Sequence, residues 1–493
     1  MTKFKPVTIE QPRQSSKNSR LSDAIHTLSK REKASFHTPG HKAKLPWLTA
    51  TLDVTELPGL DDLSNPQGLL ADLESSLSAI WEAKQSFISV NGASAALEAA
   101  IIACTGIPGR YKILVPQNAH RSTINALIIS GLEPVWYKPA WDQQFNLWAQ
   151  VYLPELERLL LEHSNELAAV LVVSPTYAGA ISDIKSISEV TAKCNIPLIV
   201  DEAHGAHFGL CRGMPESSLV LGADLVVHSL HKTLPALTQT GIVHIAKSPN
   251  SNIQGWNNSD VFARKLREAL GLLQSSSPSY LLLSSIDHLL QQLDDGSRYL
   301  SEALSHWLDL RHKIEKMPHL EAYKPRRALF NPSHILVKPK FEGKSPFNHV
   351  SNLYDYMLSL GIYPETILGD GVLYMLGSNT RDADCRLLVE ELENYGRLAK
   401  QNPSFDAELN SQAESGENLQ TPSQPEPDIF KQAISPRQAF LMPSESVPTK
   451  QAKGRISAQC LAPCPPGTCV LVPGQYIEKT AHISAESVRV VIE

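Results

Sequence analysis

Short apolar runs alternate with amphipathic stretches between Phe87 and Ile245, and this alternation constrains the fold more than any other feature of the sequence. The apolar runs are Phe87–Val90, Ile113–Val115, Ala169–Val173, Pro197–Val200, Leu225–Val227 and Gly241–Ile245. Their lengths and β-branched residues predict buried strands, and the stretches between them, such as Ala95–Cys104, predict helices. Strands and helices in this order are typical of a mostly parallel sheet with helices on both faces. We therefore expect an α/β fold.

The rest of the 493 residues divides into smaller units. Strand-like runs at His334–Val337 and Val372–Leu376 predict a second, smaller α+β domain. Residues 401–427 are poor in large apolar side chains and predict a flexible linker. The expected segments are an N-terminal segment at 1–34, a major domain at 35–310, the α+β domain at 311–400, the linker at 401–427 and a small strand-containing C-terminal module at 428–493.

Composition argues against several classes of protein. Hydrophobic residues make up 42% and charged residues 19% of the chain, and the formal net charge is -6. These values argue against a generic binder of nucleic acid or of anionic membranes. No apolar run is long enough for a membrane helix, and the first residues lack the apolar core of a signal peptide. Cys460, Cys464 and Cys469 fit no common zinc spacing, so we expect reduced thiols in a cytoplasmic protein with no metal site.

Two of the apolar runs end in residues of opposite charge. Lys232 follows the run Leu225–Val227 within a cluster of histidine and serine, and Asp201 follows the run Ile196–Val200. The spacing suits two neighbouring parallel strands, whose carboxyl ends lie at the ligand-binding edge of an α/β sheet. An amine and an acid at adjacent strand ends are what pyridoxal phosphate requires. The lysine forms the Schiff base, and the acid keeps the pyridine nitrogen protonated.

Each of these residues also has an ordinary interpretation. A lone lysine after a strand is usually a solvated surface charge, and a buried acid such as Asp201 is often paired with an arginine. We favour the cofactor interpretation because the amine and the acid end neighbouring strands, and we expect the adjacent cation to lower the pKa of Asp201. His204 either contacts another polar edge of the cofactor or supports the loop after Asp201.

Three further strand-end motifs fit the same site. The motif VNGAS at 90–94 precedes a helix, where backbone amides and the hydroxyl of Ser94 either bind a phosphate or form an ordinary N-cap turn. The motif QNAHRS at 117–122 contains His120, which either stacks on a planar cofactor ring or is a loop or cap residue. The motif SPTYAG at 174–179 contains Thr176, which either reaches the phenolic oxygen of the cofactor or belongs to a plain Pro-Gly turn.

The order of the motifs resembles a known family. The chain contains HTPGHK (37–42), ELPGLDDL (56–63), VNGAS, QNAHRS, SPTYAG, VDEAHGAH, HSLHKT, SSSPSYLLLSSID (275–287), SPRQAF and GRISAQCLAPCPPGTCVLVPG. This series is similar to the fold-type I pyridoxal-phosphate decarboxylases of ornithine, lysine and arginine. The resemblance covers nearly the whole chain and corresponds to the shorter form of the family, without a receiver-like N-terminal domain.

The resemblance implies a role for each matching residue. Lys232 becomes the Schiff-base lysine, Asp201 the partner of the pyridine nitrogen and His120 the residue that stacks on the ring. The implied phosphate ligands are Ser94, the amides of Gly92 and Ala93, Ser229 and His231. Ser276 matches a hydroxyl residue that reaches the phosphate of a neighbouring subunit, which implies a homodimer or a larger assembly.

The implied reaction is the decarboxylation of a basic L-amino acid to its amine and CO2, feeding polyamine metabolism. Glu365 and Glu445 match acidic positions of the family and are candidates for binding the distal cation. Arginine or lysine is preferred to ornithine, although Cys464 and Gln475 replace the usual tyrosine and glutamate and leave the substrate open. An aminotransferase or lyase with the same cofactor, and a regulatory binding protein without catalysis, remain alternatives.

Overall fold

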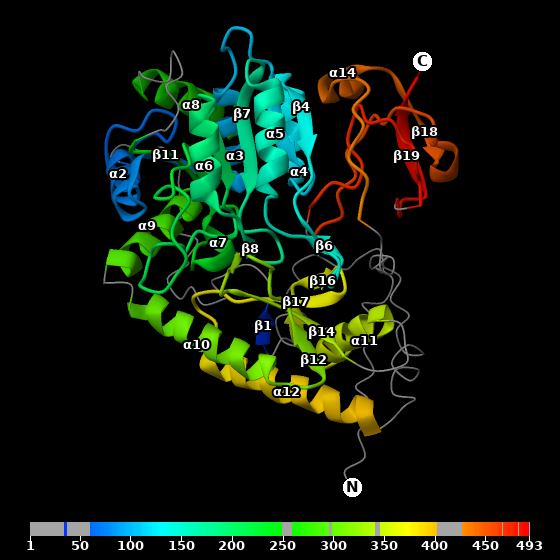
Figure 1. Ribbon diagram of the computed structural model, residues 1–493. Coiled ribbons are helices and arrows are strands. Elements are labelled where there is room, and N and C mark those ends of the chain that lie inside the picture. Colours follow the sequence, from blue (N-terminus) through cyan, green and yellow to red (C-terminus); the bar gives the residue numbers. More distant parts are fainter. Residues whose placement is uncertain are drawn as a thin grey trace, which may run out of the picture.

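The computed structural model describes residues 34–36, 60–248, 259–294, 298–340, 346–401, 426–465, 467–481 and 483–492. Nearly all of the expected N-terminal segment and linker lies outside the described residues, as does the HTPGHK motif. The described chain forms a large α/β unit, a smaller α+β unit and a C-terminal segment, which occupy different regions of Figure 1. None of the described helices is long and apolar enough to span a membrane.

A seven-stranded sheet forms the centre of the large unit and confirms the expected mostly parallel arrangement. Across the sheet, the strands are β2 (Ala83–Ser89), β11 (Gly241–Ala246), β10 (Leu225–Ser229), β9 (Leu198–Asp201), β7 (Leu167–Val173), β3 (Lys112–Pro116) and β4 (Glu133–Tyr137). Only β11 runs against its neighbours in this sheet. Strand β7 reads LAAVLVV and is buried along almost its whole length, as a strand covered on both faces must be.

Helices cover both faces of this sheet and produce two separate apolar cores (Figure 1). One core contains residues of α2 (Leu69–Ile80), α5 (Leu153–His163), α6 (Ile184–Lys193) and α9 (Tyr280–Asp294). The other contains residues of α3 (Gly92–Ala103), α4 (Arg121–Ser130) and α8 (Ser259–Leu273). Successive strand residues alternate between the cores, because side chains of a strand point to opposite faces. Val200 and Val226 lie in the first core, and Ile199 and Val227 lie in the second.

The smaller unit is an antiparallel sheet packed against helices. Its strands are β12 (Leu320–Ala322), β14 (His334–Pro339), β17 (Gly371–Met375) and β16 (Thr366–Leu368), and its helices are α10 (Arg298–Glu315), α11 (Pro346–Ser359) and α12 (Asp382–Gln401). The expected boundary between 310 and 311 falls inside α10. Because the apolar face of α10 is continuous, Trp307 and Leu310 already belong to the core of the smaller unit.

A short pairing joins the two units next to the SPTYAG motif, where strand β8 (Ala180–Ile181) pairs with β13 (Leu329–Phe330). Strand β1 (Ala34–Phe36) pairs with β15 (Ile362–Pro364) of the smaller unit. The amide of Ser378 donates a hydrogen bond of 2.8 Å to the carbonyl oxygen of Thr233, the residue after Lys232. The smaller unit therefore contacts the segment that carries the lysine.

The C-terminal segment packs beside α4 and forms its own small apolar cores. It contains α14 (Pro436–Leu441), β18 (Ser444–Pro448), η2 (Thr449–Gln451) and β19 (Ser487–Val491), and β18 pairs with β19 in the antiparallel sense. Helix α14 starts at a capping box, in which the hydroxyl of Ser435 accepts from the amide of Gln438 and the Gln438 side chain accepts from the amide of Ser435. A loop of this segment reaches back to the large unit, where Thr468 forms a backbone bridge with His120.

Candidate active site

Lys232 and Asp201 line one cavity of about 860 Å³ at the carboxyl end of the central sheet. Strands β9 and β10 are parallel neighbours, as the spacing predicts, and Val227 of β10 lies opposite Asp201. Lys232 follows β10 in the short helix α7 (Leu230–Thr233). The parallel pairing therefore brings the amine and the acid to adjacent strand ends.

Burial dominates the electrostatics of this pair. The pKa of Asp201 is raised, because the loss of hydration outweighs the favourable charge of Lys232. The charge of Lys232 acts to lower this pKa, in the direction expected of an adjacent cation, but burial has the larger effect. The pKa of Lys232 is lowered, again because of burial first, while the negative charges of Asp201 and Glu365 oppose this change. Both groups are thus pushed toward their neutral forms when the cavity holds only protein groups.

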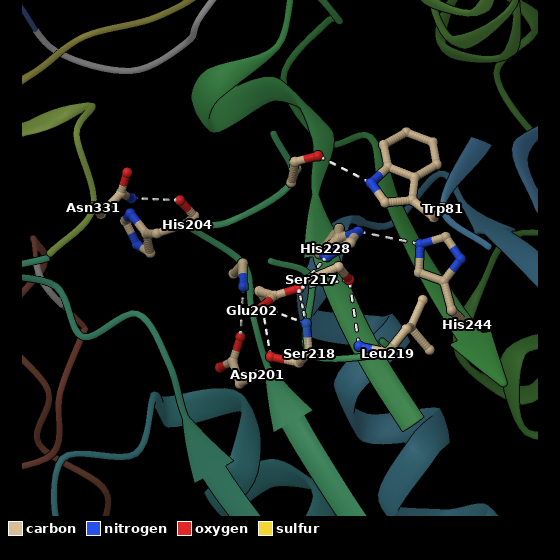
Figure 2. Close-up of polar contacts among 12 residues, drawn as sticks. Trp81, Asp201, Glu202, His204, Ser217, Ser218, Leu219, His228, His244 and Asn331 are labelled. Atoms are coloured by element: carbon tan, nitrogen blue, oxygen red, sulfur yellow. Dashed lines mark hydrogen bonds and ion pairs between the residues drawn. The ribbon is translucent and has the colours of Figure 1, made fainter. Parts of the chain in front are cut away.

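A chain of hydrogen bonds leads from Lys232 into the smaller unit. Lys232 Nζ lies 2.8 Å from His204 Nε2, and His204 Nδ1 lies 3.2 Å from His334 Nε2. Burial holds the pKa of His204 well below its usual value and lowers that of His334 to about 3, so both rings are neutral near pH 7. In that state His204 accepts from the lysine and donates to His334. Asn331 donates to the carbonyl oxygen of His204 at 2.8 Å, as Figure 2 shows.

His120 lines the cavity and also caps a helix. Its Nδ1 accepts from the amide of Ser122 at the start of α4, so the ordinary interpretation as a cap residue is correct as well. Burial, followed by the charges of Lys232 and Arg121, lowers the pKa of His120 to about 4. A neutral ring at physiological pH is suited to stacking on an aromatic cofactor.

The VNGAS turn has the shape of an anion site, although the amide of Gly92, one of the expected phosphate ligands, already has a hydrogen-bond partner. Gly92 begins α3 with a φ of +75°, which favours glycine, and its amide already donates to the carbonyl oxygen of Gln239 at 2.8 Å. Gly92 therefore shapes the turn, and the amides of Ala93 and Ser94 in the first turn of α3 remain for a phosphate. Gly241 lies behind this turn, where an added Cβ would stand 2.5 Å from the Ala93 nitrogen. Ser94, Ser229 and His231 also line the cavity.

Thr176 lines the cavity, whereas Glu365 lies next to Tyr177, which lines it. The Thr176 hydroxyl accepts from the amide of Ala180 at 3.1 Å. Glu365 accepts a hydrogen bond of 2.6 Å from the hydroxyl of Tyr177. The carboxylate of Glu365 is close enough to Lys232 to raise the pKa of the amine.

Besides Glu365, two expected site residues do not line the cavity of this single chain. Ser276 is exposed in the break between α8 and α9. Glu445 is exposed on β18, where it forms an ion pair of 2.9 Å with Arg455. Glu445 is therefore not placed to bind a cation in this cavity, because its strand, β18, pairs with β19 within the C-terminal segment.

Several polar residues near the site were not predicted. Glu202, His228 and His244 form a buried array directly behind Asp201, which Figure 2 shows, and Tyr177 and His334 contact His204. The array has a sequence signal, since a second acid directly after Asp201 points to the opposite face of the strand. No such signal exists for His334, because it comes from the other unit. Among the described residues, no group of three metal-ligating side chains comes together.

The residues present fit pyridoxal phosphate. The cavity joins a partly buried lysine, a buried acid, a neutral histidine and the first turn of a helix, which match the aldehyde, the pyridine nitrogen, the ring face and the phosphate of that cofactor. The close approach of Gly241 to Ala93 leaves no space for a side chain behind the phosphate turn. Together with the mostly parallel sheet, this site defines the fold-type I class of pyridoxal-phosphate enzymes.

Comparisons with known proteins narrow the class to one family. Residues 20–349 match the family model of the Orn/Lys/Arg decarboxylase major domain, and residues 421–491 match the model of the C-terminal domain. The chain belongs to the Orn/Lys/Arg decarboxylase family, whose members are pyridoxal-phosphate-dependent decarboxylases. The motif resemblance is thereby confirmed.

Individual relatives extend over nearly the whole chain. The arginine decarboxylase of Bacillus anthracis is 27% identical over 478 residues, which cover 93% of this chain and 90% of that protein. The uncharacterized protein YaaO of Bacillus subtilis is 30% identical over 485 residues, which cover 94% of this chain and 92% of the relative.

Solved structures share the fold at low sequence identity. The constitutive lysine decarboxylase of Escherichia coli superposes with a TM-score of 0.70 at 17% identity, covering 96% of this chain and 81% of that one. An alanine–glyoxylate aminotransferase from Nostoc superposes with a TM-score of 0.56 at 16% identity, covering 74% of this chain and 95% of that one. The second similarity extends the shared fold beyond decarboxylases.

Proposed function

We propose that this enzyme decarboxylates arginine or lysine, with ornithine a weaker substrate, and supplies the resulting amine to polyamine metabolism. One observation carries the proposal: a partly buried amine, Lys232, and a buried acid, Asp201, line one cavity with His120 and the residues of the VNGAS turn in a chain of this family. Relatives along the full length of the chain are named arginine decarboxylases. The substrate is accordingly a small basic amino acid.

Each residue has a defined task in this proposal. Bound pyridoxal phosphate withdraws electrons from the substrate, which makes loss of the α-carboxylate possible. Lys232 would hold the cofactor through its amine, and Asp201 would keep a proton on the pyridine nitrogen. His120 would cover one ring face and fix the orientation of the ring, and that orientation would favour loss of the carboxylate.

The phosphate and the substrate are held at the edges of the cavity. The phosphate would be held by the amides of Ala93 and Ser94, the Ser94 hydroxyl, Ser229 and His231, and Thr176 would face the phenolic oxygen. Glu365 offers a negative charge to the distal cation, with Tyr177 holding its carboxylate in place at 2.6 Å. His204, in contact with Lys232 at 2.8 Å, receives or returns the proton of that amine.

The proposed assembly is a cytoplasmic homodimer or a larger oligomer. The exposed position of Ser276 supports it, because an exposed hydroxyl is available to the phosphate site of a neighbouring subunit. The proposal involves no nucleic acid, membrane or metal as a partner.

Amine identification tests the function. Purified protein with pyridoxal phosphate is incubated separately with arginine, lysine and ornithine, and the amine and CO2 are measured. We expect equal amounts of CO2 and of agmatine or cadaverine. The variant K232A is expected to release none, and a control variant at the exposed Lys185, K185A, is expected to keep the parent rate. Consumption of a keto acid without CO2 would identify an aminotransferase instead and contradict the proposal.

A further inference from the structure

A row of buried polar side chains crosses four neighbouring strands beside the site. Ser86 of β2, His244 of β11, His228 of β10 and Glu202 at the end of β9 make up this row, which we call the Glu202 row. The distances are 2.7 Å from Ser86 Oγ to His244 Nδ1, 3.1 Å from His244 Nε2 to His228 Nδ1, and 2.8 Å from His228 Nε2 to Glu202 Oε2. Figure 2 shows its three larger members, and no member is more than 1% exposed.

The contacts of the row lead to Glu202. Burial holds the pKa of His244 well below its usual value, so His244 is neutral and uses one ring nitrogen as a donor and the other as an acceptor. The row is thereby continuous from Ser86 to Glu202, whose carboxylate accepts from His228 Nε2. The carboxylate also accepts from the amide of Ser218 at 3.2 Å and from the Ser218 hydroxyl at 2.5 Å.

This arrangement is more than a means of filling the core. An ionised carboxylate loses its hydration in a core and is tolerated only when donors replace the water. Apolar side chains of similar volume would hold the strands together at least as well. A fully satisfied polar network instead fixes one precise arrangement of the groups that it joins.

The row links the ends of β9 and β10, the two strands that lead to the candidate catalytic residues Asp201 and Lys232. Glu202 is bonded to Asp201 in the chain, and alternation along the strand directs Asp201 to the cavity and Glu202 to the opposite face. The amide of Glu202 donates to the carbonyl oxygen of Val227 at 3.0 Å. Gly205 packs so closely that an added Cβ would stand 2.6 Å from Glu202 Cγ. The peptide between Asp201 and Glu202 is thus held by strand β10 and by the loop that follows β9.

We propose that Glu202 is a positioning residue for Asp201, fixing the direction from which the Asp201 carboxylate meets the pyridine nitrogen of the cofactor. The inference rests on the proposed function, because it assigns Asp201 that partner. Glu202 itself touches neither cofactor nor substrate. Among the described contacts of the Asp201 carboxylate, the amide of Ala203 is a hydrogen-bond donor at 3.2 Å, so its direction depends largely on the backbone.

The variant E202Q tests the inference by cofactor affinity. Glutamine keeps the shape of glutamate, but its NH2 group faces the donors of His228 or Ser218. We expect the dissociation constant of pyridoxal phosphate, measured by equilibrium dialysis, to rise about tenfold. The matched control is E74Q, which alters another buried acid, outside the cavity, that accepts from the amide of Ile88 and from Arg267. E74Q is expected to lower stability and to keep the parent dissociation constant.

A double-mutant cycle separates positioning from a general structural effect. In a D201N protein, E202Q is expected to change the dissociation constant by less than about twofold, because Asp201 no longer provides the charge to be positioned. An unchanged dissociation constant for E202Q, or an equal rise in both backgrounds, would overturn the inference. If E202Q does not fold, the variant S218A, which removes one donor to Glu202, replaces it in the same double-mutant cycle. S218A is expected to raise the dissociation constant of pyridoxal phosphate by less than E202Q does. Failure of the parent protein to bind pyridoxal phosphate or to release CO2 would instead overturn the proposed function.

Discussion

Gly467 lies directly against the imidazole of His120. A Cβ added to this glycine would stand 2.7 Å from both Cδ2 and Nε2 of the ring. The carbonyl oxygen of Gly467 accepts from the amide of Arg121 at 3.0 Å, and the next residue, Thr468, bridges to His120. The C-terminal segment therefore forms a wall of the active site and sets the position of the proposed ring-stacking residue.

Replacing Gly467 by alanine is expected to damage activity more than stability. The matched control is G109A, because Gly109 has the same φ of +77° and no atom within 4 Å of an added Cβ. Both variants should lose about 1–2 kcal/mol of stability from the left-handed backbone. Only G467A should also lose about tenfold or more in kcat/KM, because it displaces His120. Equal kcat/KM values for G467A and G109A would contradict the conclusion that Gly467 sets the position of His120.

The phosphate turn depends on the absence of a side chain at Gly241. In G241A the new Cβ would stand 2.5 Å from the Ala93 nitrogen and from the Gly92 carbonyl carbon, so the turn must move. We expect a stability loss of about 1–3 kcal/mol and weaker binding of pyridoxal phosphate, measured by urea unfolding and equilibrium dialysis. The control G271A lies in α8 with no atom within 4 Å and should gain up to about 1 kcal/mol. Unaltered cofactor binding by G241A would argue against a phosphate at this turn.

Removing the charge of Asp201 should make Lys232 easier to deprotonate. Burial lowers the pKa of Lys232, and the negative charge of Asp201 is the largest opposing effect. In cofactor-free D201N, the pKa of Lys232 should therefore fall further. The reaction of this amine with an acylating reagent, followed by mass spectrometry against pH, should show a lower midpoint. E365Q should lower the midpoint by less, since the charge of Glu365 is the second-largest effect that raises the pKa of Lys232. A midpoint that rises in D201N would contradict the effect of the Asp201 charge on Lys232.

Buried neutral histidines should make the protein sensitive to acid. Burial lowers the pKa of His120 to about 4 and those of His207 and His334 to about 3, whereas the usual value is 6.5. Below about pH 6.5 the unfolded chain binds protons that the folded chain does not, so stability falls with falling pH. Each such group contributes about 1.4 kcal/mol per pH unit near pH 5, and acids with raised pKa values, such as Glu74, oppose this trend. Urea unfolding at several pH values measures the slope.

A single-residue change checks the origin of that slope. His207 is fully buried, and its Nε2 donates to the Oδ1 of Asn331 at 3.0 Å. In H207Q the side chain no longer titrates, so the slope between pH 5 and 6 should decrease by about 1.4 kcal/mol per pH unit. An unchanged slope would show that other groups cause the acid sensitivity.

Local features of the sequence predicted the sheet and the core of the site. The strand-end positions of Asp201 and Lys232 follow from the apolar runs before them, and adjacency of β9 and β10 follows from the spacing of a parallel crossover. The turn at Gly92 follows from a glycine between a strand and a helix. These inferences succeed because strand period and turn chemistry are local properties of the chain.

Contacts between the units could not be predicted from local sequence patterns. His334 and Asn331 reach His204 from the smaller unit, and Gly467 reaches His120 from the C-terminal segment, with no shared local pattern to link them. The net change in the pKa of Asp201 could not be predicted for a related reason. Spacing reveals a neighbouring charge, but the depth of burial that outweighs it depends on packing from all sides.

The pairing of β8 with β13, and the hydrogen bond from Ser378 to Thr233, connect the two units at the lysine itself. A shortened protein that ended near residue 310 would keep Lys232 and Asp201 but would lose His334, Asn331 and Ser378 around them. Lys232 thus belongs to a cavity assembled jointly by both units. Gene fusions or truncations that separate these units dismantle that site even when every motif of the major domain is retained.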